Sequence, residues 1–288
     1  MENEFSYLLE KQKPCHCGAA SLSYCLYVLG VEKTQSAVAK DAGSPYLIYW
    51  RGLGDEHIRK AAEKNNAVCK TLETADADVF HDRLAAHLKK GNPAILAVED
   101  CSHWVAAIGG IEDKGRFKFV VDDPIDKEKF FFVMNKSDFL GYAWNDEDSD
   151  GGEYARYYAI LISRRDGKPG VWKPTKEFLD LCEKGSYATA LEMAGDLGEI
   201  VASSGGKTRK KIPLAEIMAM EKDTVRKSLR WLDWNSAAED MDAMMEFYGD
   251  YRIVADSAGI ECPADASRVA LVSQITALLV TCAWTGTL

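Results

Sequence analysis

Five short apolar runs follow one another between residues 93 and 163, and they constrain the fold more than any other feature of the sequence. They are "PAILAVE" (93–99), "HWVAAIGGIE" (103–112), "RFKFVVD" (116–122), "KFFFVM" (129–134) and "YYAILIS" (157–163). Their β-branched and aromatic content and their lengths are typical of strands. Three segments with helical spacing come before or between them, at 18–30, 56–65 and 78–90. Helices followed by a succession of strands predict an α+β domain.

The chain changes character after the last of these runs. The segment "RRDGKPGVWKP" (164–174) is rich in Gly, Pro and charge, as a linker is. Beyond it, nearly every stretch has the apolar spacing of amphipathic helices. We therefore predict two domains, an α+β domain over residues 1–165 and a mainly helical domain over residues 175–288. The segment "NDEDSDGGE" (145–153) has no apolar residue and predicts a solvated loop in the sheet region.

The net charge, the first residues and the most apolar run of the sequence indicate which partners and which location to expect. A formal net charge of −10 gives no support to a nucleic-acid partner. The first residues lack the basic start and apolar core of a secretory signal, so we expect a cytoplasmic protein with its eight cysteines reduced. The most apolar run (269–284) is short for a membrane span and contains polar residues. We expect it to form a buried helix without membrane insertion, with a tail anchor as the alternative.

Cys17 is the candidate nucleophile. It stands directly before Gly18, at the start of the first helical segment. A cysteine at a helix N-terminus is favoured as thiolate by the helix dipole and by the unpaired backbone N–H groups. Gln12, five residues earlier, is placed to donate its side-chain amide to an oxyanion.

His103 is the best candidate for a base because it begins an apolar strand, which is a rigid mount for an imidazole. His16 is adjacent to Cys17 in sequence, so its side chain points away from the thiol. The other three histidines lie among charged helical residues and predict surface positions: His57, His81 and His87.

An acidic group is expected to orient the histidine, and the next strand ends with two of them, Asp122 and Asp123. If the strands pair as an antiparallel hairpin through the turn at 112–116, one of these carboxylates lies at the same end of the sheet as His103. The two side chains point to opposite faces of a regular strand, and the residues alone leave both open.

Three sequence blocks together resemble papain-like cysteine peptidases, and more narrowly the bacteriocin-processing (double-glycine leader) peptidase group. They are Gln12…Cys17-Gly-Ala-Ala-Ser-Leu, "GNPAILAV" followed by His103-Trp-Val, and "VVD" followed by Asp123-Pro; together they cover roughly residues 8 to 163. The resemblance implies a papain-like domain of N-terminal helices packed on an antiparallel sheet. It implies Cys17 as nucleophile, His103 as general base and acid, Asp123 as orienting acid and Gln12 as oxyanion donor. The family usually places the glutamine six residues before the cysteine.

These observations predict thiol-dependent acyl transfer or hydrolysis of an amide or peptide bond, with a peptide or small amide as substrate. An acyltransferase or a deamidase on the same fold is an alternative. A second alternative is a non-catalytic binding or regulatory protein that uses its helical domain to contact a protein partner. We expect no cofactor and no metal, because Cys15, His16 and Cys17 lack the two-residue gap of zinc knuckles and no second Cys/His pair has a suitable spacing.

Overall fold

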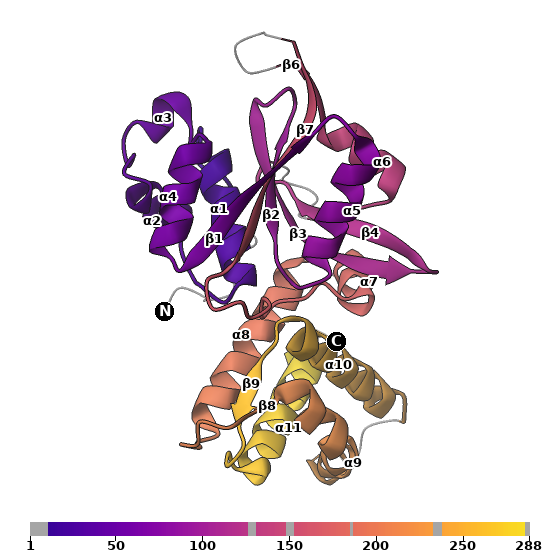
Figure 1. Cartoon of the computed structure of the whole chain (residues 1–288). Coiled ribbons are helices and arrows are strands. Elements are labelled where there is room, and N and C mark those ends of the chain that lie inside the picture. The colour runs from indigo at the N-terminus through magenta and orange to yellow at the C-terminus, as the bar shows by residue number, and fades with distance from the viewer. Residues whose placement is uncertain (1–10, 126–130, 148–152, 185–186, 233–237, 286–288) are drawn as a thin grey trace. The chain divides into compact units, whose positions relative to one another are not determined.

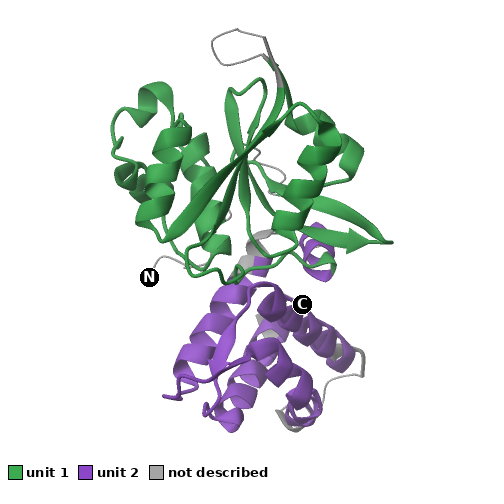
Figure 2. Ribbon diagram, viewed as in Figure 1, with its two compact units in different colours: residues 1–176 green, residues 177–288 purple. Residues whose placement is uncertain are grey.

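The computed structural model describes the chain except for residues 1–10, 126–130, 148–152, 185–186, 233–237 and 286–288 (Figure 1). It divides into two compact units, residues 1–176 and 177–288, which Figure 2 colours separately. The first unit is α+β, with N-terminal helices packed on an antiparallel sheet, and the second is mainly helical. This fold class is the one that the sequence predicts. Each unit is described by itself below.

A seven-stranded sheet forms the centre of the first unit, and all its neighbouring strands are antiparallel. The strands are β1 (Ala67–Thr74), β2 (Ala94–Val98), β3 (His103–Asp113), β4 (Arg116–Asp122), β5 (Phe131–Met134), β6 (Trp144–Glu147) and β7 (Glu153–Arg164). Their order is β1-β7-β2-β3-β4-β5, with β6 also on β7. All five predicted strands are present, and the expected hairpin joins β3 to β4, with Asp113 opposite Arg116. The sequence did not predict β1 or β6.

Helices cover both faces of this sheet (Figure 1). They are α1 (Cys17–Val28), α2 (Gln35–Asp41), α3 (Ile48–Arg51), α4 (Asp55–Lys64), α5 (Ala77–Leu88) and α6 (Lys136–Ala143). The first four lie on one side of the sheet, and α5 and α6 lie on the other. The three predicted helices correspond to α1, α4 and α5, whereas α2, α3 and α6 were not predicted.

An apolar core fills the space between the sheet and α5 and α6. Phe119 of β4 stacks on Phe139 of α6, with ring centroids 3.8 Å apart, and Phe80 of α5 stacks on Tyr157 of β7 at 4.7 Å. Phe80, Phe119 and Phe139 are fully buried, and each such side chain contributes about 1.5–3 kcal/mol relative to exposure. This core fixes the sheet onto which the opposite helices pack.

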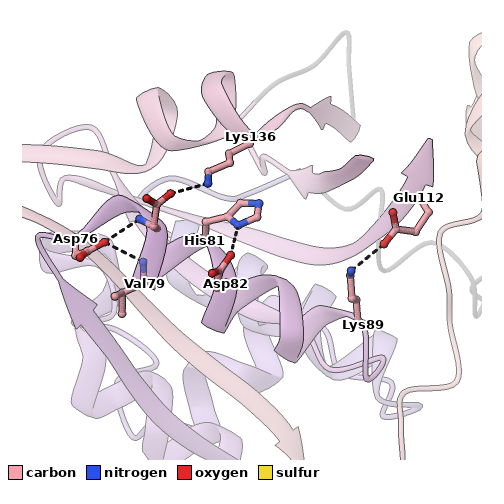
Figure 3. A network of polar contacts seen from close by, with 8 residues as sticks. Asp76, Val79, His81, Asp82, Lys89, Glu112 and Lys136 are labelled. Carbon is pink, nitrogen blue, oxygen red and sulfur yellow. Dashed lines mark hydrogen bonds and ion pairs between the residues drawn. The ribbon is translucent and has the colours of Figure 1, made fainter. Parts of the chain in front are cut away.

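Polar contacts hold α5 at both ends (Figure 3). Asp76 caps its start by accepting hydrogen bonds from the backbone N–H groups of Asp78 and Val79. Beyond its other end, Lys89 pairs with Glu112 of β3 at 2.8 Å. A side-chain cap of this kind is typically worth about 1 kcal/mol, so the helix start is defined by its own sequence.

The buried helix α1 determines where its N-terminus lies. Eleven of its 12 residues are buried, because the other helices and the sheet enclose it. Ser21 donates a hydrogen bond to the carbonyl of Trp104 in β3 at 2.9 Å, and Cys25 contacts the carbonyl of Ala94 in β2. The prediction that Cys25 is a core residue is confirmed. These contacts bring the start of α1 to the end of the sheet at which β3 begins.

Asn145 corrects the prediction of a solvated loop at 145–153. It lies in β6 and is fully buried, while residues 148–152 fall outside the described part of the chain. Its side chain accepts from the N–H of Cys101 at 2.9 Å and donates to the carbonyls of Ala97 and Ala143. The polar side chain is therefore buried because it pairs backbone groups that the strands leave unpaired.

The segment 164–174, which the sequence predicts as a linker, packs at several points against other residues of the first unit. The N–H of Gly170 donates to the carbonyl of Gly91, and that of Val171 donates to the carbonyl of Val28. Trp172 is buried, and Pro174 lies so close to Gly109 that a Cβ there would be 2.6 Å from it. Residues 165–169 of the segment are exposed.

The second unit consists of helices and one small sheet. Its elements are α7 (Lys176–Lys184), α8 (Tyr187–Ser203), β8 (Lys211–Pro213), α9 (Leu214–Leu232), α10 (Ala238–Ser257), β9 (Glu261–Pro263) and α11 (Arg268–Thr285). The strongly apolar run at 269–284 lies in α11, where Leu271, Ile275 and Leu279 are buried. Among the described residues, no helix has both the length and the hydropathy that a membrane crossing requires.

The buried amide of Asn145 predicts a stability effect. Replacing Asn145 by Ala removes the partner of Cys101 N–H and of two carbonyls, so we expect the free energy of unfolding to fall by about 2–4 kcal/mol. Chemical denaturation measures it, with the exposed neighbour variant Asp146→Ala as control. Equal losses in the two variants would contradict the structural role of the amide.

Candidate active site

Cys17 is the first residue of α1, and the N-terminus of this helix has no side-chain cap. The N-cap residue His16 makes no capping hydrogen bond, whereas Thr34, Asp76 and Asn135 cap α2, α5 and α6. The first N–H groups of α1 therefore remain for other acceptors, including the thiolate itself. Gly18 allows the backbone of Leu53 to pack closely against the start of α1, since a Cβ there would lie 3.1 Å from the carbonyl of Leu53.

His103 and Asp123 meet at the end of the hairpin formed by β3 and β4. His103 is the first residue of β3 and is buried, and its Nε2 lies 2.9 Å from Oδ1 of Asp123. The thiol of Cys17 interacts with the same imidazole, which raises the pKa of His103 and lowers that of Cys17. Because Nε2 faces the carboxylate, Nδ1 is the ring nitrogen that remains for the thiol. The structure thus brings together three of the four residues that the sequence predicts.

The protonation of this trio follows from their contacts. Burial raises the pKa of the Cys17 thiol, but hydrogen bonds from His103 and from backbone N–H groups outweigh it and lower the pKa below its usual value. Burial lowers the pKa of His103, but its hydrogen bonds to Asp123 and Cys17 raise it to about 9. His103 is therefore charged near neutral pH, and its charge favours the thiolate form of Cys17.

Asp123 is held by three donors. Burial raises the pKa of its carboxyl, and the hydrogen bond from His103 and the Ile125 N–H lower it below its usual value. The Ile125 N–H donates to Oδ1 at 3.0 Å, and the hydroxyl of Tyr142 donates to Oδ2 at 3.1 Å. Both carboxylate oxygens are therefore engaged, which fixes the orientation of the group facing His103. Sequence reasoning missed Tyr142, because α6 itself was not predicted.

Asp122 has a different environment from Asp123. It is the last residue of β4 and is almost fully buried, and neither carboxyl oxygen has a hydrogen-bond partner among the described residues. Burial raises the pKa of this carboxyl well above its usual range, with a smaller contribution from the charge of Asp123. Of the two aspartates that the sequence left open, Asp123 contacts the histidine and Asp122 does not.

Gln12 lies beside the turn that carries Asp123. Its backbone N–H donates to the carbonyl of Pro124 at 3.1 Å. The flanking residues are held by the buried Gln35 of α2, which donates to the carbonyl of Lys11 and accepts from the N–H of Lys13. The side-chain Oε1 of Gln12 is buried and has no hydrogen-bond partner among the described residues. Sequence reasoning missed Gln35, because α2 was not predicted.

The remaining histidines are not part of this arrangement. His16 is buried, donates from Nδ1 to the carbonyl of Pro14 and packs against Tyr49. His57 is exposed, as predicted. His87 was wrongly expected at the surface: it is half-buried, because its Nε2 bridges the carbonyls of Pro93 and Ile162. Within the described residues, no group of three or more His, Cys, Asp or Glu side chains is placed to hold a metal ion.

Solved structures similar to this chain include two peptidase domains. One is the peptidase domain of Streptococcus ComA, a bi-functional ABC transporter involved in a quorum sensing pathway; it shares 16% identity and a TM-score of 0.37, over 54% of this chain and 95% of that chain. The other is a double glycine motif protease from an AMS/PCAT transporter, solved in complex with the leader peptide, with 18% identity and a TM-score of 0.35, over 53% of this chain and 89% of that chain. No family model matches the chain, and no curated protein does.

The thiolate form of Cys17 predicts a specific pH dependence of its alkylation. Iodoacetamide should modify Cys17 at pH values below the usual thiol range, because His103 holds its pKa down. In the His103→Gln variant the hydrogen bond and charge of His103 no longer oppose the effect of burial, which raises the pKa of Cys17. The pH profile of alkylation should therefore move to higher pH. Mass mapping of each cysteine measures this, with the exposed His57→Gln as control. If His103→Gln and His57→Gln gave the same pH profile, His103 would not be the cause of the lowered pKa of Cys17.

Asp122 predicts a pH dependence of stability. Its pKa is raised in the folded protein, so its contribution to stability is present below the unfolded pKa of about 3.9 and is lost as the pH rises. The Asp122→Asn variant should therefore gain stability relative to wild type on going from acid to neutral pH. Asp113→Asn should do the opposite, because Lys118 lowers the pKa of Asp113. Chemical denaturation at acid and at neutral pH measures the free energy of unfolding of each variant. A difference between Asp122→Asn and wild type that does not change with pH would refute the raised pKa of Asp122.

Proposed function

We propose that the chain is a thiol-dependent enzyme that transfers or hydrolyses the acyl group of an amide or peptide bond. Cys17 acts as the nucleophile, His103 as general base and acid, and Asp123 as the group that orients His103. The observation that supports this most strongly is the 2.9 Å hydrogen bond between His103 and Asp123, together with the interaction of the same imidazole with Cys17, which lowers the pKa of the thiol.

In the first step the Cys17 thiolate attacks the carbonyl carbon of the amide, and a sulfur–carbon bond forms. Negative charge develops on the carbonyl oxygen. The N–H groups at the start of α1, which no side chain caps, and the side-chain amide of Gln12 are the donors proposed to stabilise it. The imidazolium of His103 then gives its proton to the leaving nitrogen, the carbon–nitrogen bond breaks, and a thioester remains on Cys17.

The second step resolves the thioester. Neutral His103 takes a proton from a water molecule or from an acceptor amine as it attacks the thioester carbon. The sulfur–carbon bond breaks, the acyl group leaves as an acid or a new amide, and the thiolate and imidazolium are restored. Asp123 keeps Nδ1 of His103 directed at the sulfur through both steps, because it holds Nε2. Water makes the enzyme a peptidase or deamidase, and an amine makes it an acyltransferase.

A non-catalytic binding or regulatory protein is the competing function, with the helical unit as its contact for a protein partner. On that account nothing requires the thiol of Cys17 to be reactive. The buried cysteine Cys25, whose pKa is raised well above the usual value by burial, shows what a purely structural cysteine in this chain looks like. The lowered pKa of Cys17 favours the enzyme.

The enzyme proposal predicts loss of activity on removal of single groups. Release of free amine from a panel of N-acetyl peptides and small amides should occur with wild type and not with Cys17→Ala. Cys15→Ala is the matched control, because Cys15 is exposed and lies two residues away, and it should retain activity.

Gln12→Ala should lower kcat about 10²–10³-fold, which is the usual effect of removing one oxyanion donor. The same panel measures it. Amine release by Cys17→Ala or by His103→Ala at the wild-type rate would refute the enzyme proposal. Unchanged kcat in Gln12→Ala would remove only the oxyanion role of that side chain.

A further inference from the structure

The turn directly before His103 has an unusual backbone. It joins β2 to β3 over residues 99–102. Glu99, Asp100 and Cys101 all have positive φ, at 52°, 52° and 60°. Residues other than glycine rarely adopt this left-handed conformation, and three in succession store strain. Because the turn contains no glycine, contacts from outside it must hold its shape.

The sequence of this turn departs from the usual preference for its geometry. The N–H of Ser102 donates to the carbonyl of Glu99 at 3.0 Å, so Asp100 and Cys101 are the two central residues. Positive φ at both central positions is the arrangement of a type I′ turn, which strongly prefers Asn-Gly or Asp-Gly. Cys101 stands where glycine is preferred. Such departures are expected at functional sites, where other contacts compensate for them.

Asn145 provides the main contact that holds the turn. It is fully buried in β6, and its Oδ1 accepts a hydrogen bond from the N–H of Cys101 at 2.9 Å. Its Nδ2 donates to the carbonyl of Ala97 in β2 at 3.1 Å, so one amide fixes the chain on both sides of the turn. The next residue adds a second contact, because the N–H of Asp146 donates to Oδ1 of Asp100 at 2.8 Å.

The same amide contacts the helix that holds Asp123. Nδ2 of Asn145 also donates to the carbonyl of Ala143, the last residue of α6, at 3.2 Å. The residue before Ala143 is Tyr142, whose hydroxyl donates to Oδ2 of Asp123 at 3.1 Å. Asn145 therefore joins the turn that precedes the base to the helix end that holds the orienting acid. Reacting groups need support of this kind to stay within about 0.5 Å of their working positions.

We propose that Asn145 is a positioning residue of the active site, and that it acts by holding the left-handed turn 99–102 and the end of α6. By this route it keeps His103 within reach of Asp123 and Cys17. The inference rests on the proposed function and adds a supporting residue to the same site. The alternative is a purely structural amide that pairs buried backbone groups. Only a positioning role couples Asn145 to the protonation of the site.

Asn145→Ala tests the inference, because it lets the strained turn relax and His103 move away from Asp123. NMR of histidine-labelled protein, with His103→Gln for assignment, measures the titration. The pKa of His103 should fall from about 9 by about one unit or more. The pH profile of Cys17 alkylation by iodoacetamide should move to higher pH, because His103 no longer lowers the pKa of the thiol as strongly. Neither measurement needs a known substrate.

Asn65→Ala is the matched control. Asn65 is also a buried asparagine, and its Nδ2 donates to Oδ2 of Asp41 at 2.9 Å and to the carbonyl of Ala61 at 2.8 Å. It precedes β1 at the end of the sheet opposite to His103. Its loss should therefore lower the free energy of unfolding and leave the pKa of His103 unchanged.

Cys101→Gly, added to Asn145→Ala, tests whether the turn is the route. Glycine adopts positive φ without strain, so the turn should keep its shape without the hydrogen bond from Asn145. The double variant should therefore regain about half or more of the lost pKa of His103. The remainder reflects the contact with α6, which glycine does not restore.

Asp100→Ala provides the test if Asn145→Ala does not fold. Asp100 is exposed, and the change removes the acceptor of the Asp146 N–H and places alanine at positive φ. Asp100→Asn removes the same charge but keeps an acceptor oxygen and tolerates the left-handed conformation. The pKa of His103 should therefore be lower in Asp100→Ala than in Asp100→Asn.

Three results with the folded Asn145→Ala variant would overturn the inference: a wild-type pKa of His103 with a wild-type alkylation profile, an equal shift in Asn65→Ala, or no recovery with Cys101→Gly. Without that variant, an equal pKa of His103 in the two Asp100 variants overturns it. The proposed function fails separately, if Cys17→Ala releases amine at the wild-type rate. That result leaves the coupling between Asn145 and His103 as measured.

Discussion

The hydrogen bond between His103 Nε2 and Asp123 Oδ1 is the contact on which the candidate site depends. It exists because β3 and β4 pair in one register, which places the first residue of β3 and the residue after β4 at the same end of the sheet. The bond keeps the imidazole charged at neutral pH and leaves its other nitrogen for Cys17. A shift of register by one residue would turn one of the two side chains to the opposite face and separate them.

The buried helix α1 supplies the other half of the site. Its packing against β2 and β3 fixes the position of Cys17, and its N-terminus has no side-chain cap. A side-chain cap such as Thr34 gives α2 would stabilise the helix but occupy the backbone N–H groups of its first turn.

Much of this arrangement could be predicted from the sequence, because the strong signals are local. The apolar runs identified five strands, and Cys17 before Gly18 identified a helix start. The short α3, and β1 with its mostly polar exposed side, carry no comparable periodicity. Asn145 and His87 were misjudged because polar residues are buried when backbone groups need partners, which depends on tertiary contacts. Tyr142 and Gln35 support the site from elements that were not predicted, and a single sequence has no signal for such contacts.

The proposed site requires that Cys17 and His103 form a thiolate–imidazolium pair, and an NMR titration of the His103 imidazole distinguishes this pair from a neutral one. His103 is expected to stay protonated through neutral pH and to titrate at about 9, and Cys17→Ala is expected to move this titration to lower pH because the thiolate no longer stabilises the charge. A titration at or below the ordinary histidine value of about 6.5, unchanged by Cys17→Ala, would contradict it.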